Sequence, residues 1–270
     1  MTSLDSRFVG SIPEIYDGIL VPMIFEVYAK DLAEQVANSG ALAVLETAAG
    51  TGALTRALAA RLSTAARLLA TDLNQPMLDY GAARAPADAR VSRRQADALA
   101  LPYEGETFDA VACQFGVMFF PDKVQGYCEA RRVLRPGGRF VFNVWDALSE
   151  NTFPSAVSEA LADYFPHDPP RFMQRTPHGY YDLDQIRRQL ELAGFTLVTA
   201  EAADHVSRAR SARDIAVAFC QGTPLRNEIE ARNPGGLEAA TDHVAEAVAR
   251  RFGEGACEGK LRAILVTAQA

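Results

Sequence analysis

Between about residues 43 and 145, short apolar runs alternate with stretches that carry apolar residues at helical spacing. The runs predict buried strands, and the leucines of LTRALAARL (54–62) recur every three or four positions, which favours a helix. This alternation is typical of parallel βαβ units. The predicted strands are 41–47, 67–72, 89–97, 107–115, 139–146, 195–202 and 261–269, and the predicted helices are 54–62, 75–84, 124–134 and 182–195.

Two longer segments interrupt this pattern after the fifth and sixth predicted strands. The first is rich in aromatic residues and proline and is expected to be only partly helical, whereas the second has a helical pattern. Both should lie over the carboxyl edge of the sheet, where open α/β sheets bind ligands. The predicted organisation is an N-terminal helical segment (1–40), a cofactor-binding half (41–146), a substrate-side insertion (147–181), a helix and sixth strand (182–204), a helical lid insertion (205–260) and a last strand (261–270).

Charge and composition narrow the classes of function. The net charge of -7 and the isoelectric point near 5.2 argue against a nucleic-acid partner, because phosphate binding draws on clustered lysine and arginine. No apolar run approaches the roughly 20 residues of a membrane helix, and MTSLDSRFVG does not resemble a secretory signal. The four cysteines form no CxxC pair, so we expect free thiols in a reducing cytoplasm and no metal site.

A glycine loop, LETAAGTGAL, follows the first predicted strand. Gly50 and Gly52 lie where the strand turns into a helix, and their missing side chains let a ligand approach the backbone amides. Asp72 ends the next strand, where a carboxylate can accept hydrogen bonds from ribose hydroxyls. Each feature has an alternative: a tight turn without a ligand for the loop, and a helix N-cap for Asp72. Together they would also suit a nicotinamide dinucleotide fold.

Residues further along the chain distinguish these alternatives. The GxGxxG pattern is absent, because the register is Ala48-x-Gly50-x-x-Ala53. Asp97 follows the third strand, where it could accept a hydrogen bond from an adenine amino group or be an ordinary loop acid. The motif QFG (114–116) ends the fourth strand, and the turn RPGG (135–138) precedes the fifth.

The ordered series LETAAGTG, TDLNQPML, ADALALPYEGETFDAV, CQFGVMFFPD and EARRVLRPGGRFVF resembles the class I S-adenosylmethionine-dependent methyltransferases. It is most similar to the branch that includes the ubiquinone and menaquinone biosynthesis methyltransferases. The resemblance covers about residues 40–146, with a fainter match in YYDLDQIRRQLELAGF. It implies an α/β fold with a Rossmann-like seven-stranded sheet, α-helices on both faces, helical insertions over the carboxyl edge, and S-adenosylmethionine as the cofactor.

The resemblance also implies which residues surround the cofactor. Glu46, Gly50 and Gly52 would surround its methionine end, together with Ala48 and Thr51 of the same loop. Asp72 would hold the ribose, Leu73 and Met77 would pack near the adenine, and Asp97 and Ala98 would contact the adenine edge. Gln114, followed by Phe115, would lie beside the methionine amine. Tyr16 would lie over the cofactor, with a helix-packing aromatic as the alternative. The sequence departs from the family at Ala48, where a first glycine is usual, which adds one methyl group to the loop.

Methyl transfer from a sulfonium needs proximity and in-line orientation more than a protein nucleophile. The reaction can also use a general base. The candidate is His178 in TPHGYYD, with a surface loop histidine as the alternative. Aromatic residues near and within the insertions suggest a small apolar or aromatic acceptor, methylated on O, N or C, although they could instead form the core of an insertion. Two alternatives stay open: a quinone-precursor C-methyltransferase, and a cofactor-binding regulatory or scaffold protein without activity. A homodimer is also left open.

Overall fold

The computed structural model describes residues 12–270, and within this range one sheet of seven strands organises the chain. The strands are β1 Ala43–Glu46, β2 Arg67–Asp72, β3 Val91–Gln95, β4 Phe108–Gln114, β5 Leu134–Trp145, β6 Thr196–Ala209 and β7 Cys257–Gln269. Their order in the sheet is β3-β2-β1-β4-β5-β7-β6. The helices are α1 Ile12–Ile15, the π-helix η1 Tyr16–Phe25, α2 Glu26–Asn38, α3 Ala53–Arg61, α4 Gln75–Arg84, η2 Val117–Phe119, α5 Lys123–Val133, η3 Leu148–Glu150, α6 Thr152–Tyr164, α7 Phe172–Arg175, α8 Leu183–Leu192, α9 Ala212–Cys220, α10 Leu225–Arg232 and α11 Leu237–Phe252.

The first five strands of the sheet are parallel. β1 pairs with β2 and β4, β2 pairs with β3, and β4 pairs with β5. β7 runs antiparallel to β5, because Ala270 pairs with Gly138 near one end and Arg262 with Asp146 near the other. The carboxyl ends of β1, β2, β4 and β5 therefore share one edge, which places the residues that follow them close together.

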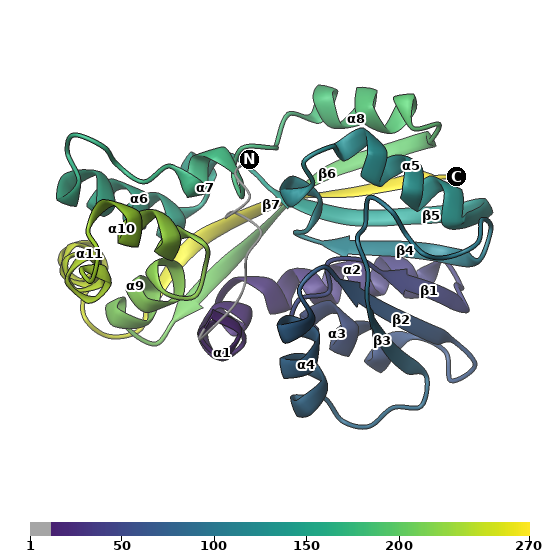
Figure 1. Ribbon diagram of the computed structural model, residues 1–270, viewed down its shortest axis with the longest axis horizontal. Coiled ribbons are helices and arrows are strands. Elements are labelled where there is room, and N and C mark those ends of the chain that lie inside the picture. The colour runs from purple at the N-terminus through teal and green to yellow at the C-terminus, as the bar shows by residue number, and fades with distance from the viewer. Residues whose placement is uncertain (1–11) are drawn as a thin grey trace. The chain divides into compact units, whose positions relative to one another are not determined.

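The chain divides into two compact units. Unit 2 contains residues 26–144, 181–203 and 263–270, and unit 1 contains the described residues 12–25 together with 145–180 and 204–262. Unit 2 holds most of the sheet, with β1 to β4 entirely inside it (Figure 1). Unit 1 is mostly helical, and in it α11 packs against α9 and α6.

Helices cover both faces of the sheet in unit 2. On one face, α2 and α3 bury Leu32 and Leu58 against Val44, Ala110 and neighbouring strand residues. On the other face, an aromatic cluster joins Phe140 and Phe142 of β5 to Tyr127 on α5 and to Phe195. The ring centroids of its contacting pairs lie 4.8 to 5.8 Å apart. Alternate residues of β5 thus face opposite layers, as a two-faced sheet requires.

These features confirm the predicted fold class, and several local signals are confirmed with it. Pro76 lies in the first turn of α4, and Asp182 caps α8 by accepting the backbone N–H groups of Asp184 and Gln185. Gly194 follows α8 with a left-handed φ of 87°. All four cysteines are free thiols in the described range.

Several strand lengths differ from the prediction. β6 continues to Ala209 and β7 begins at Cys257, so both ends of the segment 205–260 are strand rather than helix. β6 and β7 are neighbours in the sheet, and pairing with each other lengthens both strands. The pattern of either segment alone does not indicate this pairing. β3 is shorter than predicted. Residues 135–138 form an irregularity within β5, because Leu134 pairs with Phe108 whereas Arg139 already pairs with Ala110.

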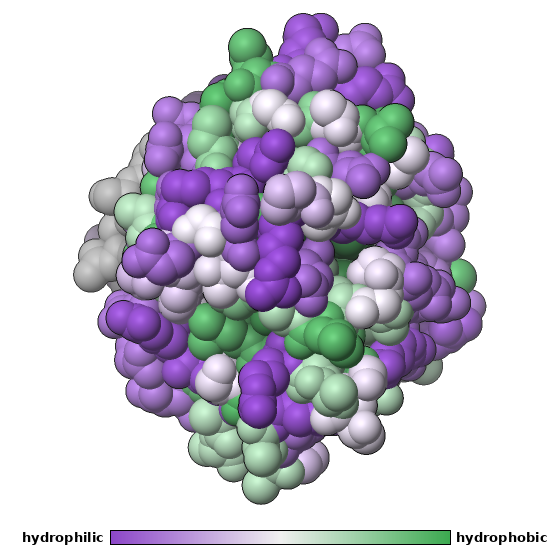
Figure 2. All heavy atoms as spheres, turned by 90° about the vertical axis from the view of Figure 1, so that its right-hand side faces the viewer, coloured by the Kyte–Doolittle hydropathy of each residue, from purple (hydrophilic) through white to green (hydrophobic). Residues whose placement is uncertain are grey.

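Figure 2 views the protein from the right-hand side of Figure 1. The surface seen there is mostly hydrophilic, and its apolar side chains form separate small groups. No helix in residues 12–270 has the length and apolar character needed to span a membrane.

Candidate functional site

The loop between β1 and α3 turns the chain from strand to helix within six residues. Ala48, Gly50 and Gly52 all have left-handed backbone conformations, with φ values of 53°, 57° and 86°. Glycine adopts this conformation without strain, whereas Ala48 carries a cost of about 1–2 kcal/mol. α3 begins at Ala53, directly after the loop, so the N–H groups of its first turn lie next to the loop and favour a negatively charged ligand group.

Asp72 joins the glycine loop to the end of β2. Its Oδ2 accepts the N–H of Gly50 at 2.8 Å, and its Oδ1 accepts the N–H of Asn74 at 2.7 Å. Asn74, not Asp72, is the N-cap residue of α4, so the helix-cap interpretation of Asp72 is wrong. The carboxyl is 7% exposed, and its burial raises its pKa above the ordinary value.

Glu46 ends β1 beneath the loop and is 1% exposed. Its Oε2 accepts the hydroxyl of Thr55 at 2.6 Å, and its main-chain carbonyl accepts the hydroxyl of Thr71 at 2.9 Å. Desolvation raises the pKa of Glu46 to about 8, against the lowering effect of the Thr55 hydrogen bond. The carboxyl is therefore a proton-bearing group around neutral pH, and a cation beside it would favour its ionisation.

Leu73 and Met77 differ sharply in exposure. Leu73 is 51% exposed directly after Asp72, which leaves an apolar surface at the edge of the sheet. Met77 is 3% exposed and packs beneath the loop, because a Cβ on Gly50 would lie 3.6 Å from its Cε. The acidic side chain of Asp97 is exposed, and its Oδ1 accepts the N–H of Leu99 at 2.9 Å. Ala98 beside it is half-buried.

The end of β4 approaches the glycine loop closely. Gln114 is half-buried, and Phe115 after it has a left-handed φ of 51°. The N–H of Phe115 donates to Oδ1 of Asn143 at 2.9 Å. A Cβ on Gly116 would lie 2.4 Å from the Cβ of Ala48, so only glycine fits there.

Asn143 and Gly116 were not predicted as site residues. Gly81 was missed too: a Cβ there would lie 2.5 Å from the carbonyl oxygen of Thr51, so α4 packs directly on the loop. Thr51 itself is 1% exposed and accepts a hydrogen bond from Arg56 Nη1 through its carbonyl. A glycine inside the predicted helix 75–84 was the available signal for Gly81, because glycine is unfavourable in a helix interior unless packing requires it.

This constellation fits a nucleoside with a charged amino-acid arm. The first turn of α3 begins directly after the glycine loop, Leu73 presents an apolar surface, and Asp72 retains lone pairs beyond those it uses for Gly50 and Asn74. The positive φ of Gly50, with open space up to Met77 Cε, keeps the backbone there accessible to a ligand.

Comparison with known proteins shows the family. A model described as a methyltransferase domain matches residues 45–142. A demethylmenaquinone methyltransferase of Clavibacter sepedonicus is 42% identical over 167 residues, which are 57% of this chain and 66% of that protein. The ubiquinone/menaquinone biosynthesis C-methyltransferase UbiE of Burkholderia vietnamiensis is 32% identical over 164 residues, which are 57% of this chain and 68% of that protein.

The chain belongs to the class I S-adenosylmethionine-dependent methyltransferases. The fold agrees: phosphoethanolamine N-methyltransferase 2 of Haemonchus contortus, solved with S-adenosyl-L-methionine, has a TM-score of 0.61 at 16% identity, covering 99% of this chain and 60% of that one. S-adenosylmethionine is the cofactor of this methyltransferase, and the contacts of individual residues with it remain predictions.

Two predicted site residues of the methyltransferase, Tyr16 and His178, belong to unit 1. The Tyr16 ring lies 5.0 Å from that of Phe25, centroid to centroid. His178 is 3% exposed, and its ring lies 6.1 Å from that of Trp145. Its Nδ1 is 2.8 Å from the carbonyl oxygen of Asp146, which can only accept, so Nδ1 carries the proton and Nε2 the lone pair. Desolvation lowers the pKa of His178 to about 4.

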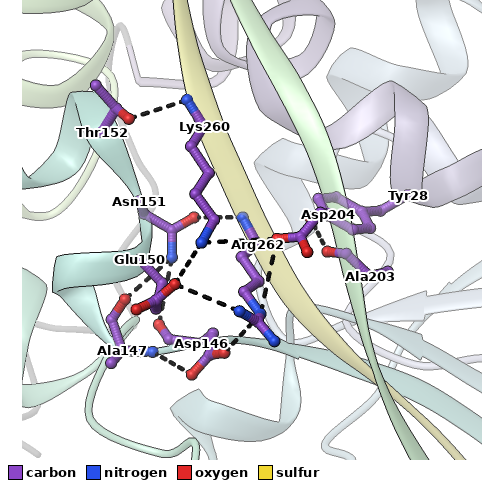
Figure 3. Close-up of polar contacts among 10 residues, drawn as sticks. All are labelled: Tyr28, Asp146, Ala147, Glu150, Asn151, Thr152, Ala203, Asp204, Lys260 and Arg262. Atoms are coloured by element: carbon purple, nitrogen blue, oxygen red, sulfur yellow. Dashed lines mark hydrogen bonds and ion pairs between the residues drawn. The ribbon is translucent and has the colours of Figure 1, made fainter.

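An ion-pair network holds Asp146, the residue that orients His178. Arg262 Nε lies 3.3 Å from Asp146 Oδ2 and 3.7 Å from Asp204 Oδ1, and Lys260 Nζ lies 2.5 Å from Glu150 Oε2. Figure 3 shows the Arg262 guanidinium pointing toward the carboxylates of both aspartates. The backbone N–H of Asp146 also donates to the carbonyl of Arg262, so its main chain is fixed on two sides.

Most aromatic side chains of the first insertion pack into unit 1. Phe153, Phe172 and Tyr180 are buried, and the ring of Phe153 lies edge-on to that of Phe252 at 5.8 Å. Tyr181, in unit 2, is 44% exposed. These contacts support the alternative that the aromatic residues form the core of the insertion.

Proposed function

We propose that this methyltransferase transfers a methyl group to O, N or C of a small, apolar or aromatic acceptor. The observation that supports the methyl-transfer part of the proposal is the contact at the sheet edge, in which the Asp72 carboxylate holds the glycine loop through the N–H of Gly50. The class of the acceptor is an expectation from the sequence. When bound, S-adenosylmethionine supplies a methyl group on a positive sulfur, which leaves as a neutral thioether. The chain has to orient the two reactants, which can contribute about 7–11 kcal/mol.

We propose the predicted cofactor residues for that orientation. The loop residues from Glu46 to Gly52 would hold the methionine end, Asp72 the ribose, and Leu73 with Met77 the adenine side. Asp97, Ala98, Gln114, Phe115 and Tyr16 complete the proposed set. Supporting this set, most of its members follow β1, β2 or β4 at the shared carboxyl edge of the sheet.

We propose His178 as the group that takes a proton from the acceptor. Its tautomer, fixed by the contact of Nδ1 with the Asp146 carbonyl, leaves the lone pair on Nε2. Replacing His178 with glutamine should lower kcat by about 10²–10⁴-fold, the usual contribution of a general base, and leave the affinity for S-adenosylhomocysteine unchanged. Steady-state kinetics and calorimetry on the same preparations measure both. Full turnover of the variant from pH 6 to 9 would remove His178 from the mechanism.

A second candidate is methylation of a quinone precursor on carbon, favoured by the names of the two relatives. The helical segment within 205–260 favours the broader proposal, because a compact quinone enzyme would not need it. Transfer of a labelled methyl group to a panel of phenols, aromatic amines and quinone precursors separates the two. Transfer to quinone precursors alone selects the second candidate, and transfer to none of the panel contradicts both.

We propose a small molecule rather than a nucleic acid as the partner, since the chain carries a net charge of -7. A cytoplasmic location and a homodimer stay predictions.

A further inference from the structure

Asn143 is a fully buried carboxamide in β5 that the family's motifs do not include. It has 0% exposure and pairs in register with Gln114 of β4. Its Oδ1 accepts the N–H of Phe115 at 2.9 Å, whereas its Nδ2 has no partner among residues 12–270. An unpaired buried amide costs about 1–3 kcal/mol. An apolar residue at this position would avoid that cost. What asparagine supplies instead is the hydrogen bond that its Oδ1 accepts from Phe115.

That bond holds a strained residue. Phe115 has a φ of 51°, a conformation that costs a non-glycine residue about 1–2 kcal/mol. Its side chain is 5% exposed and lies edge-on to Tyr28, with ring centroids 5.4 Å apart. Tyr28 is itself anchored, because its hydroxyl donates to the carbonyl of Ala203 at 2.9 Å (Figure 3). Phe115 is therefore fixed by its ring on one side and by its N–H on the other.

The strained residue sets the contact between two loops. Directly after Phe115, Gly116 lies so close to Ala48 that a Cβ on it would be 2.4 Å from the Ala48 methyl carbon. Ala48 is itself left-handed, with a φ of 53°. Ala48 and Phe115, two strained residues that follow the adjacent strands β1 and β4, thus lie at the tight contact between Ala48 and Gly116. A shift of Phe115 would therefore shift the glycine loop.

We propose that Asn143 is a positioning residue for cofactor binding, because it fixes the main chain after β4 and, through the contact of Gly116 with Ala48, the glycine loop that holds the methionine end. This inference rests on the proposed cofactor role of that loop and of Gln114. Asn143 acts through Phe115 and Gly116 and needs no contact with the cofactor itself.

Two variants separate the bond from the volume of the side chain. Asn143→Leu keeps a similar size but removes the acceptor, whereas Asn143→Asp keeps an oxygen for the Phe115 N–H and alters only the unpaired end. Calorimetry at pH 6, where burial favours the neutral carboxyl, would compare S-adenosylhomocysteine with 5′-methylthioadenosine, which lacks the amino-acid arm. We expect Asn143→Leu to weaken S-adenosylhomocysteine at least about tenfold and 5′-methylthioadenosine little, with Asn143→Asp near wild type.

Hydrogen exchange of the Phe115 amide, measured on the folded variants, gives a readout independent of affinity. We expect faster exchange at Phe115 in Asn143→Leu but not in Asn143→Asp. If Asn143→Leu does not fold, Asn143→Ala replaces it, since it removes the same acceptor. Wild-type affinity in the folded leucine or alanine variant, or equal losses in that variant and Asn143→Asp, would overturn the inference. Absence of S-adenosylhomocysteine binding in the wild type would instead contradict the proposed function.

Discussion

Two buried carboxyls, Glu46 and Asp72, end adjacent strands on either side of the glycine loop. Both have raised pKa values because burial disfavours their charged forms. Asp72 offsets part of that effect with the backbone N–H groups of Gly50 and Asn74, whereas Glu46 has the hydroxyl of Thr55. Because burial raises the pKa of Glu46 to about 8, its ionisation should be visible in the stability of the protein near neutral pH.

The contribution of Glu46 to the free energy of unfolding should fall as the pH rises from about 4.5 to about 8. The folded-state pKa of Glu46, about 8, exceeds its ordinary value of 4.5, so its stabilising contribution is complete below pH 4.5 and is lost through this window. A pKa difference of one between the folded and unfolded states corresponds to about 1.4 kcal/mol, so the loss should amount to several kcal/mol. Glu46→Gln cannot ionise, so urea unfolding at pH 5 and pH 9 should show a smaller difference than in wild type. Identical pH dependence in both proteins would contradict the assignment.

At the residue scale, the sequence predicted the groups that a local pattern marks. Gly50, Gly52 and Asp72 stand at the ends of strands that their own apolar runs indicate. Asn143 and Gly116 could not be found this way. Asn143 binds a backbone group 28 positions away, and Gly116 matters because of Ala48 in the loop after another strand. Such roles depend on register between strands, which a single sequence does not specify.

At the scale of elements, the contact between the loops after β1 and β4 explains why Ala48 is tolerated where the family usually has glycine. Its methyl group occupies space that Gly116 leaves empty. Among the elements themselves, α6 was not predicted as a full helix, although Phe153, Val157 and Leu161 recur at helical spacing and are buried. Proline and aromatic residues around it concealed that period.

Gly116→Ala should destabilise the protein by about 1–3 kcal/mol, the usual range for an overpacked core. The new Cβ would lie 2.4 Å from Ala48 Cβ and 2.7 Å from Cys113 Sγ. Ala48→Gly in the same chain removes the first of these clashes and should recover part of the loss, whereas the Cys113 clash would persist. Thermal unfolding of the two single variants and the double variant measures the coupling. Strict additivity would show that the two loops are not in the contact described.

At the scale of the whole molecule, the five ordered motifs over residues 40–146 were sufficient to predict the family, whereas the last two strands of the sheet were predicted from their own apolar runs. The sequence did not predict which segments form unit 1, because this unit gathers three separate stretches of chain. A Cβ on Gly222, after α9, would lie 2.8 Å from Ile15 Cγ2, which shows how closely the N-terminal helices pack against a segment far away in the sequence. No local pattern in either stretch indicates that contact.

The edge formed by the glycine loop and Asp72 is proposed to bind S-adenosylmethionine. Titration calorimetry with S-adenosylhomocysteine tests it most directly, on wild type, on Asp72→Ala, and on Asp79→Ala as a matched control with an exposed carboxylate on α4. We predict binding to wild type and to Asp79→Ala, a loss of at least about tenfold in Asp72→Ala because a charged acceptor is removed, and no binding of NADH. Binding of NADH without binding of S-adenosylhomocysteine at millimolar concentration would contradict the claim, and unchanged affinity in Asp72→Ala would remove Asp72 from the site.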